Sequence, residues 1–172
     1  MLFSNINKLV VTLSMLAFLG LKTTAAEIEA GAPLPKVSCL DEAGKNVELA
    51  TEGASGFTLV YFYPKADTPG CTKQACSLRD SYAVLTEKGV RVFGVSHDGV
   101  EAQKKFKEKY NLPFTLLADT ESVVANAFGV PTMAGITKRQ AYLFKDGKLV
   151  WRDLAAATDK QAADVLAVLA GK

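Results

Sequence analysis

Two cysteines five residues apart follow an apolar run and a loop that contains two prolines and a glycine. Residues 57–63 are almost wholly apolar and predict a buried strand, and the loop after them leads to Cys71. Apolar residues at helical spacing come next, namely Ala75, Leu78, Tyr82 and Leu85. Cys71 therefore stands at the expected first turn of a helix that ends near Gly89.

A cysteine in that position is suited to nucleophilic chemistry. The thiolate is the reactive form, and the unpaired N–H groups and dipole of a helix N-terminus stabilise its negative charge. Thr68 lies in the same loop, where its hydroxyl can point at whatever Cys71 attacks, and Pro64 fixes the backbone at the start of the loop. The other interpretation of Cys71 is a small buried apolar residue. The agreement of strand, loop, cysteine and helix favours the nucleophile.

Cys76 is the candidate partner of Cys71. The spacing is not the Cys-x-x-Cys of a thioredoxin-type dithiol. Residues five apart on an ideal helix have Cα atoms roughly 8.5 to 9 Å apart, whereas a disulfide needs less than about 7 Å. A Cys71–Cys76 disulfide therefore requires the first turns of the helix to unwind. Cys76 could instead be a buried helix residue without a redox role.

The spacing of proline, threonine and cysteine resembles the active-site motif of a known family. Pro64-x-x-x-Thr68-x-x-Cys71 resembles the motif of the peroxiredoxins, and Cys76 at plus five resembles the resolving cysteine of their Q-type group, also called the bacterioferritin-comigratory-protein group. The residues that flank the motif on both sides are similar to that group as well. The resemblance runs from about Ala30 to the C-terminus.

This resemblance implies an α/β fold, the thioredoxin-like fold in its peroxiredoxin version, with a central mixed sheet flanked by helices. A single domain over residues 27–172 is expected. The alternation of predicted strands and helices independently favours a three-layer α/β domain. Strands are expected at 37–40, 45–49, 90–95, 114–117, 140–145 and 149–152, and helices at 99–110, 119–128 and 162–169. Asp146-Gly147 predicts a tight hairpin turn, and residues 158–161 resemble a capping box.

A positively charged partner for Cys71 is expected near the second half of the chain. Arg139 precedes the strand at 140–145 and matches, by position, the arginine that peroxiredoxins place beside the attacking cysteine. A guanidinium there would favour the thiolate and stabilise charge on the reacting oxygens. Lys138 or Arg152 remains conceivable for this role, and Arg139 could be a plain surface residue.

The resemblance implies a thiol-dependent peroxidase that reduces hydrogen peroxide and organic hydroperoxides. Cys71 would become a sulfenic acid, and Cys76 would resolve it as an intramolecular disulfide, which a thioredoxin-like dithiol protein would reduce. No cofactor is expected. The alternatives are a thiol–disulfide exchange or redox-sensor protein and a binding module without activity. The segment 129–132 resembles the cis-proline signature of dithiol oxidoreductases, but residues 133–138 separate it from the next strand.

Two further residues have less certain roles. Cys39 lies in the expected strand at 37–40 without an evident partner, so an inert packing role is favoured over a resolving role. His97, the single histidine, lies in a loop at the carboxyl end of the strand at 90–95, where ligands sit in open α/β sheets. A lone loop histidine is more often solvated than functional. No metal site is predicted, because the cysteine spacing fits no zinc pattern.

The N-terminal segment predicts export. Lys8, an uncharged apolar stretch at 9–21 and small residues before Ala26 are typical of a cleaved signal peptide over residues 1–26, although an uncleaved anchor is an alternative. A periplasmic or secreted protein is expected. Without Lys8 and Lys22 the basic residues number 20 − 2 = 18, equal to the 18 acidic residues. This balance predicts neither nucleic-acid nor membrane binding after cleavage. A monomer or weak dimer is expected.

Overall fold

The computed structural model describes residues 26–171 and is built around a mixed sheet of five strands. The strand order is β5-β4-β3-β8-β9. These strands are β3 (Phe57–Phe62), β4 (Val90–Ser96), β5 (Thr115–Ala118), β8 (Gln140–Lys145) and β9 (Lys148–Asp153). β3, β4 and β5 run parallel, whereas β8 pairs antiparallel with both β3 and β9. This arrangement confirms the predicted mixed sheet of a thioredoxin-like peroxiredoxin fold.

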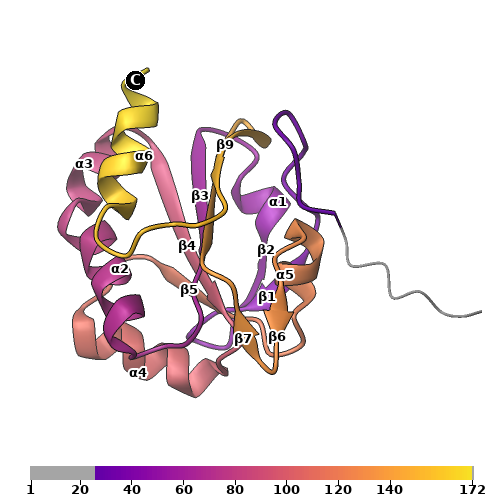
Figure 1. Cartoon of the computed structure of the whole chain (residues 1–172), viewed down its shortest axis with the longest axis vertical. Coiled ribbons are helices and arrows are strands. Elements are labelled where there is room, and N and C mark those ends of the chain that lie inside the picture. Colours follow the sequence, from indigo (N-terminus) through magenta and orange to yellow (C-terminus); the bar gives the residue numbers. More distant parts are fainter. Residues whose placement is uncertain (1–25, 172) are drawn as a thin grey trace, which may run out of the picture.

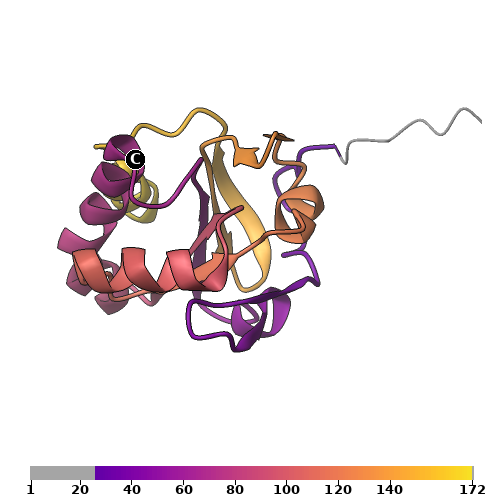
Figure 2. The same ribbon diagram turned by 90° about the horizontal axis from the view of Figure 1, so that it is seen from below.

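Two layers cover the sheet, one on each face (Figures 1 and 2). One layer consists of α2 (Pro69–Asp80), α3 (Tyr82–Glu87), α4 (Val100–Tyr110) and α6 (Gln161–Leu169). The other consists of the hairpin β1 (Ser38–Leu40) and β2 (Asn46–Glu48) with α1 (Leu49–Glu52) and α5 (Val123–Phe128). The predicted three-layer domain is therefore confirmed.

The alternation of side chains along β3 divides the core in two. Because successive residues of a strand point to opposite faces, Leu59, Tyr61 and Tyr63 pack under α2, α3, α4 and α6. Val60 and Phe62 pack against the layer of α1, α5 and the β1–β2 hairpin. Cys71 is itself part of the first core, so its side chain helps to pack the start of α2 against the sheet.

Several local features differ from the sequence expectations or were not among them. The helix expected to run from Cys71 to about Gly89 is divided at Ser81 into α2 and α3. Serine is a weak helix former because its hydroxyl can bond to nearby backbone groups in place of the helical hydrogen bonds. The capping box at 158–161 is wrong, because α6 begins at Gln161 and no side chain caps it. A hairpin of β6 (Thr132–Met133) and β7 (Ile136–Thr137) and the short α1 were not expected. The peptide bond before Pro131 is trans, unlike the cis-proline signature.

The predicted turn is present, and so is the cap that the sequence offers at Asp119 or Thr120 for the helix that runs to Phe128. Asp146 and Gly147 have φ of 49° and 72°, as a two-residue hairpin turn that joins β8 to β9 requires. Asp119 accepts hydrogen bonds from the N–H groups of Val124 at 3.0 Å and Ala125 at 2.8 Å, so its side chain caps the first turn of α5. Both features were readable from the sequence because they depend on neighbouring residues only.

The predicted signal peptide lies almost wholly outside the described residues, which begin at Ala26. Within residues 26–171, no helix combines the length and the apolar character that crossing a bilayer requires.

Candidate active site

Cys71 lies in the first turn of α2, as predicted. Thr68 is the N-cap residue and Pro69 occupies the first helical position, where proline is favoured because its missing N–H costs no hydrogen bond. The Thr68 carbonyl accepts the first helical hydrogen bond, from the N–H of Thr72 at 2.8 Å. Only 2% of Cys71 is exposed. The candidate nucleophile is therefore held at a helix start, shielded from bulk solvent.

Arg139 contacts the sulfur of Cys71. Its Nη2 donates to Cys71 Sγ at 3.4 Å. The register of the sheet explains this meeting, because Gln140 at the start of β8 pairs with Phe62 at the end of β3. Arg139 therefore lies at the same edge of the sheet as the loop that follows β3. The predicted pairing of Arg139 with Cys71 is present, whereas Lys138 is exposed to solvent.

Arg152, the other candidate arginine, binds elsewhere. It donates to the carbonyl of Ile28 at 2.6 Å and forms an ion pair with Glu29 at 2.9 Å. These contacts fix the N-terminal part of the described chain to β9. Arg152 therefore does not compete with Arg139 for the position beside Cys71.

Gln74 completes the surroundings of the guanidinium and was not predicted from the sequence. It lies one helical turn after Cys71 and is fully buried. Its Oε1 accepts a hydrogen bond from Arg139 Nη1, and its Nε2 donates to Gln161 Oε1 at 2.8 Å. The spacing of three residues places Gln74 on the same helix face as Cys71. A glutamine on the buried face of the expected helix was the one available indication.

The loop that carries Thr68 is fixed at several points. The Thr68 hydroxyl donates to the Lys65 carbonyl at 3.0 Å, and the Ala66 N–H donates to Asp98 Oδ2 at 2.7 Å. Asp67 adopts a left-handed φ of 57° and accepts hydrogen bonds from Lys109 and from the Tyr110 hydroxyl. These two bonds lower the pKa of the Asp67 carboxyl below its usual value. The loop is thereby tied to both ends of α4.

A buried polar network supports the same loop from beneath. Tyr63 donates its hydroxyl proton to Gln103 Oε1. Gln103 Nε2 in turn donates to Ser96 Oγ and to the Leu117 carbonyl, each at 2.9 Å. Ser96 donates to Asp98 Oδ2 at 2.7 Å, which closes the connection to the loop. Burying such a network is favourable only when its members are paired, so the network holds the loop in one arrangement.

Cys76 lies on the same unbroken helix as Cys71. Both thiols are free, and Cys76 is half-buried whereas Cys71 is buried. Because α2 is continuous over Pro69–Asp80, ideal helix geometry puts their Cα atoms about 8.7 Å apart. This separation exceeds the reach of a disulfide. The structure therefore represents the reduced arrangement, in which the two cysteines do not meet.

Cys39 lies on the opposite side of the sheet from Cys71. It belongs to β1 and packs against the core of Val60 and Phe62. Burial and the nearby Asp119 raise the pKa of the Cys39 thiol to about 12. At neutral pH it is thus a protonated thiol, which is a poor nucleophile.

We expect Cys39 to be the least reactive of the three cysteines. In the folded, reduced protein at pH 7.5, iodoacetamide should modify Cys39 at least about tenfold more slowly than a free cysteine, because only the thiolate reacts and the pKa is raised by several units. Peptide mass analysis over time measures the rate. Alkylation of Cys39 as fast as in the urea-unfolded chain would contradict this expectation.

His97 does not join the group around Cys71. Its Nδ1 lies 3.2 Å from the Ser122 hydroxyl, and its ring packs near Gly135 of the β6–β7 turn. These partners come from the layer of α5 and the β6–β7 hairpin. The structure gives His97 a local packing contact and no part in the site.

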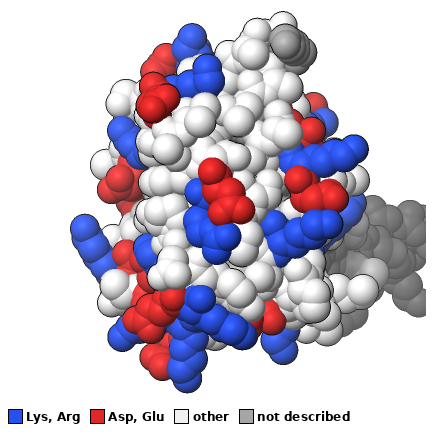
Figure 3. Space-filling model, turned by 90° about the vertical axis from the view of Figure 1, so that its left-hand side faces the viewer, with Lys and Arg blue, Asp and Glu red and all other residues white. Residues whose placement is uncertain are grey.

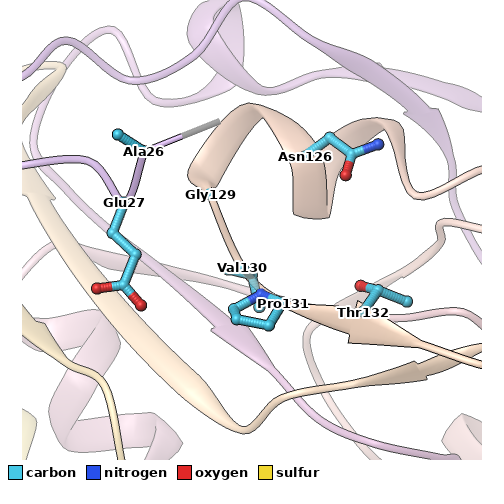
Figure 4. Close-up of a pocket in the computed structure, with 7 residues that line it drawn as sticks. All are labelled: Ala26, Glu27, Asn126, Gly129, Val130, Pro131 and Thr132. Carbon is cyan, nitrogen blue, oxygen red and sulfur yellow. The ribbon is translucent and has the colours of Figure 1, made fainter. Parts of the chain in front are cut away.

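Two surface features lie apart from the nucleophile. A pocket of about 600 Å³ is lined by Ala26 and Glu27 on one side and by residues 129–132 on the other (Figure 4). It begins where the described chain begins, and Cys71, Thr68 and Arg139 do not line it. On the face that Figure 3 presents, positive and negative side chains are interspersed. In residues 26–171 no cluster of three or more His, Cys, Asp or Glu side chains is arranged to hold a metal ion.

The chain is similar to proteins of known family. The profile of the AhpC/TSA family matches residues 30–152. The chloroplastic peroxiredoxin Q of Suaeda salsa is 42% identical over 120 residues, which are 69% of this chain and 56% of that protein. The structure of the peroxidoxin BcpB from Mycobacterium tuberculosis has a TM-score of 0.79 and 30% identity, with 84% of this chain and 98% of that chain covered.

A further similar structure is that of the bacterioferritin comigratory protein of Xanthomonas campestris, for which an alkyl peroxide reduction activity is stated. It has a TM-score of 0.75 and 25% identity to this chain, with 83% of this chain and 98% of that chain covered. The match to the curated Suaeda salsa protein spans little more than half of that protein's length. Sequence, fold and site geometry agree: the chain belongs to the AhpC/TSA family and is similar to its Q-type peroxiredoxins.

Proposed function

We propose that the protein is a thiol-dependent peroxidase in which Cys71 is the nucleophile. The observation that carries this proposal is the contact of 3.4 Å between Arg139 Nη2 and Cys71 Sγ at the start of α2. A guanidinium and a helix N-terminus both stabilise a thiolate, and both are rigidly held. The family match and the alkyl peroxide reduction activity stated for the Xanthomonas campestris relative support the same chemistry.

In the first step the Cys71 thiolate attacks the terminal oxygen of a hydroperoxide. The S–O bond forms as the O–O bond breaks, so sulfur is oxidised to the sulfenic acid. The leaving alkoxide or hydroxide takes up one proton and becomes an alcohol or water. Arg139 donates to the oxygens as charge moves onto them. Thr68 already donates its proton to Lys65, so its oxygen is free to accept a hydrogen bond from the hydroperoxide.

In the second step Cys76 resolves the sulfenic acid. The Cys76 thiol attacks Cys71 Sγ, the S–O bond breaks, and water leaves as the Cys71–Cys76 disulfide forms. The helical separation of about 8.7 Å forbids this step in the reduced arrangement, so the first turns of α2 must unwind. Leu78, which is fully buried, anchors the second half of α2 while the first half opens.

The disulfide is then reduced by an external dithiol. We propose a thioredoxin-like protein for this role, because two thiols that end as a disulfide supply the two electrons and two protons that the cycle needs. The described residues contain the nucleophile, the resolving thiol and the oxygen-binding groups, so no cofactor is required for the proposed cycle. Hydrogen peroxide and organic hydroperoxides both present the O–O bond that Cys71 attacks.

We also propose that the protein is exported and works as a monomer or weak dimer. The support for export is the amino-acid sequence of residues 1–26 alone. The support for independence from a partner subunit is the intramolecular nature of the proposed disulfide. N-terminal sequencing of the protein from a periplasmic extract tests export, and a mature chain that begins near Glu27 is the expected result.

Trapping the sulfenic acid tests the proposed function. In Cys76→Ser the first step proceeds but the second cannot, so one equivalent of hydrogen peroxide should convert Cys71 to a species that dimedone labels. Peptide mass analysis locates the label. Labelling of Cys71 within seconds supports the peroxidase. If Cys71 remains a free thiol after minutes while the wild type exchanges readily with a small disulfide, the protein is a thiol–disulfide exchange protein instead.

A further inference from the structure

The entry to α6 contacts the part of α2 that lies between the two cysteines. Lys73 forms an ion pair with Asp159 at 3.1 Å, and Gln74 Nε2 donates to Gln161 Oε1 at 2.8 Å. A longer contact of 3.5 Å joins the Ala162 N–H to Ser77 Oγ, just beyond Cys76. We call Asp159, Gln161 and Ala162 the α6 clamp.

The contacts of the α6 clamp differ in strength. Lys73 and Asp159 are more than half exposed, and exposed ion pairs contribute little to stability. Gln74 and Gln161 are both fully buried, and a buried hydrogen bond is costly to leave unmade. Gln161 is therefore the member of the clamp on which the hold on α2 chiefly rests.

The hydrogen bonds that connect Gln161 to Cys71 through Gln74 and Arg139 can be arranged in one way only. A guanidinium only donates, so Arg139 requires the oxygen of the Gln74 amide. The Gln74 nitrogen must then face α6, where Gln161 presents its own oxygen. Gln161 thereby fixes the orientation of the Gln74 amide, and that amide in turn fixes the guanidinium that contacts Cys71 Sγ.

The stability of the fold does not by itself require a glutamine at position 161. The Nε2 of Gln161 is buried and has no hydrogen-bond partner among the described residues. An apolar side chain at this position would remove that unpaired donor, although it would leave Gln74 Nε2 unpaired in its place. One buried donor is unpaired in either case, so replacing Gln161 by leucine gains or loses little stability.

We propose that Gln161 is a positioning residue that acts on both steps of the reaction, in opposite directions. It holds Arg139 on Cys71 through Gln74, which favours attack on the peroxide. The same hydrogen bond must break when the segment between Cys71 and Cys76 unwinds, so it opposes formation of the disulfide. Gln161 thus sets how long the sulfenic acid persists before it is resolved, and so its exposure to a second peroxide. This inference rests on the proposed peroxidase chemistry at Cys71.

The test compares full-length wild type with Gln161→Leu, Gln161→Glu and Ala163→Gln. Gln161→Leu removes the acceptor for Gln74, Gln161→Glu keeps an acceptor, and Ala163 is exposed on the same helix as a matched control. Three quantities are measured: amide hydrogen exchange of residues 72–77 in the reduced protein, the rate of Cys71 oxidation by hydrogen peroxide, and the rate of the following disulfide formation.

For Gln161→Leu we expect faster exchange of residues 72–77, slower Cys71 oxidation and faster disulfide formation, each by about two- to tenfold, which is the effect of one hydrogen bond. Exchange in α4 should be unchanged, Gln161→Glu should return all three quantities toward wild type, and Ala163→Gln should match wild type. Exchange at 72–77 equal to wild type would overturn the proposal, as would two rates that change in the same direction or faster exchange in α4 as well.

The exchange measurement needs no peroxide, so it separates this inference from the proposed function. If wild-type Cys71 does not react with peroxide, the peroxidase proposal fails. The clamp on α2 is still supported or overturned by exchange at residues 72–77.

Discussion

Replacing Cys71 with serine should lower the rate of hydroperoxide consumption at least about a thousandfold, because a serine hydroxyl supplies almost no oxyanion at neutral pH and the nucleophile has no substitute. Cys76 cannot take over, since it lies five residues after Cys71 on α2. Ideal helix geometry places it about 140° around the helix from the thiol that Arg139 contacts. Peroxide loss is measured with a dithiol reductant present in excess.

Cys39→Ser is the matched control for this prediction. It changes the same atoms, but on the opposite side of the sheet and in a thiol that is protonated at neutral pH. We expect it to consume peroxide at the wild-type rate within about twofold. If Cys71→Ser keeps more than a tenth of the activity, or Cys39→Ser loses most of it, the assignment of the nucleophile is wrong.

Replacing Arg139 with leucine should lower the second-order rate of Cys71 oxidation by about 10- to 150-fold. A hydrogen bond to a charged group contributes about 1.5–3 kcal/mol, and each 1.36 kcal/mol is a factor of ten in rate. The loss removes both the donor at 3.4 Å from Cys71 Sγ and the partner of Gln74 Oε1. Stopped-flow oxidation of the reduced protein by hydrogen peroxide gives the rate.

Two further variants show whether the effect of Arg139→Leu comes from the guanidinium at this position. Arg139→Lys keeps the charge but lacks the planar fork that reaches sulfur and amide together, so an intermediate rate is expected. Arg152→Leu removes an arginine of the same sheet that binds Ile28 and Glu29, and it should oxidise as wild type does. An Arg139→Leu rate within twofold of wild type would show that the contact with Cys71 has no part in the reaction.

The part of the site that local sequence determines was predicted. The buried strand at 57–62, the loop and the start of α2 depend on neighbouring residues, so the position of Cys71 in the first turn of a helix followed from spacing, whereas the N-cap position of Thr68 was not predicted. Arg139 was assigned by its place before β8, and the antiparallel register of β3 with β8 gives the physical reason.

The part that depends on distant contacts was not predicted. Gln74 and Gln161 are 87 residues apart, and no local pattern indicates that their amides meet. Gln161 was instead assigned to a capping box, which the structure does not contain. A glutamine can either cap a helix or form a buried hydrogen bond to another helix, and the local sequence does not distinguish the two roles. Gln103 and Asp98 were missed for the same reason, as their partners lie in β4, β5 and the loop before α2.

The proposed unwinding of α2 connects these observations. The reduced arrangement orients Cys71 toward Arg139 and keeps it from Cys76, so the proposed peroxide attack and disulfide formation require two conformations of one segment. Its second half is anchored by Leu78, and its first half is held by polar contacts to Arg139 and α6 in addition to the buried side chain of Cys71. Polar contacts are directional and break over small displacements, which suits a segment that must open and reform.

The central claim is that peroxide oxidises Cys71 and that Cys76 then resolves it. The most direct test mixes the fully reduced protein with one equivalent of hydrogen peroxide, counts free thiols and maps the disulfide by peptide mass. We predict the loss of two thiols, a Cys71–Cys76 link and a free Cys39. A link between Cys39 and Cys71, or no loss of thiols, would contradict the account.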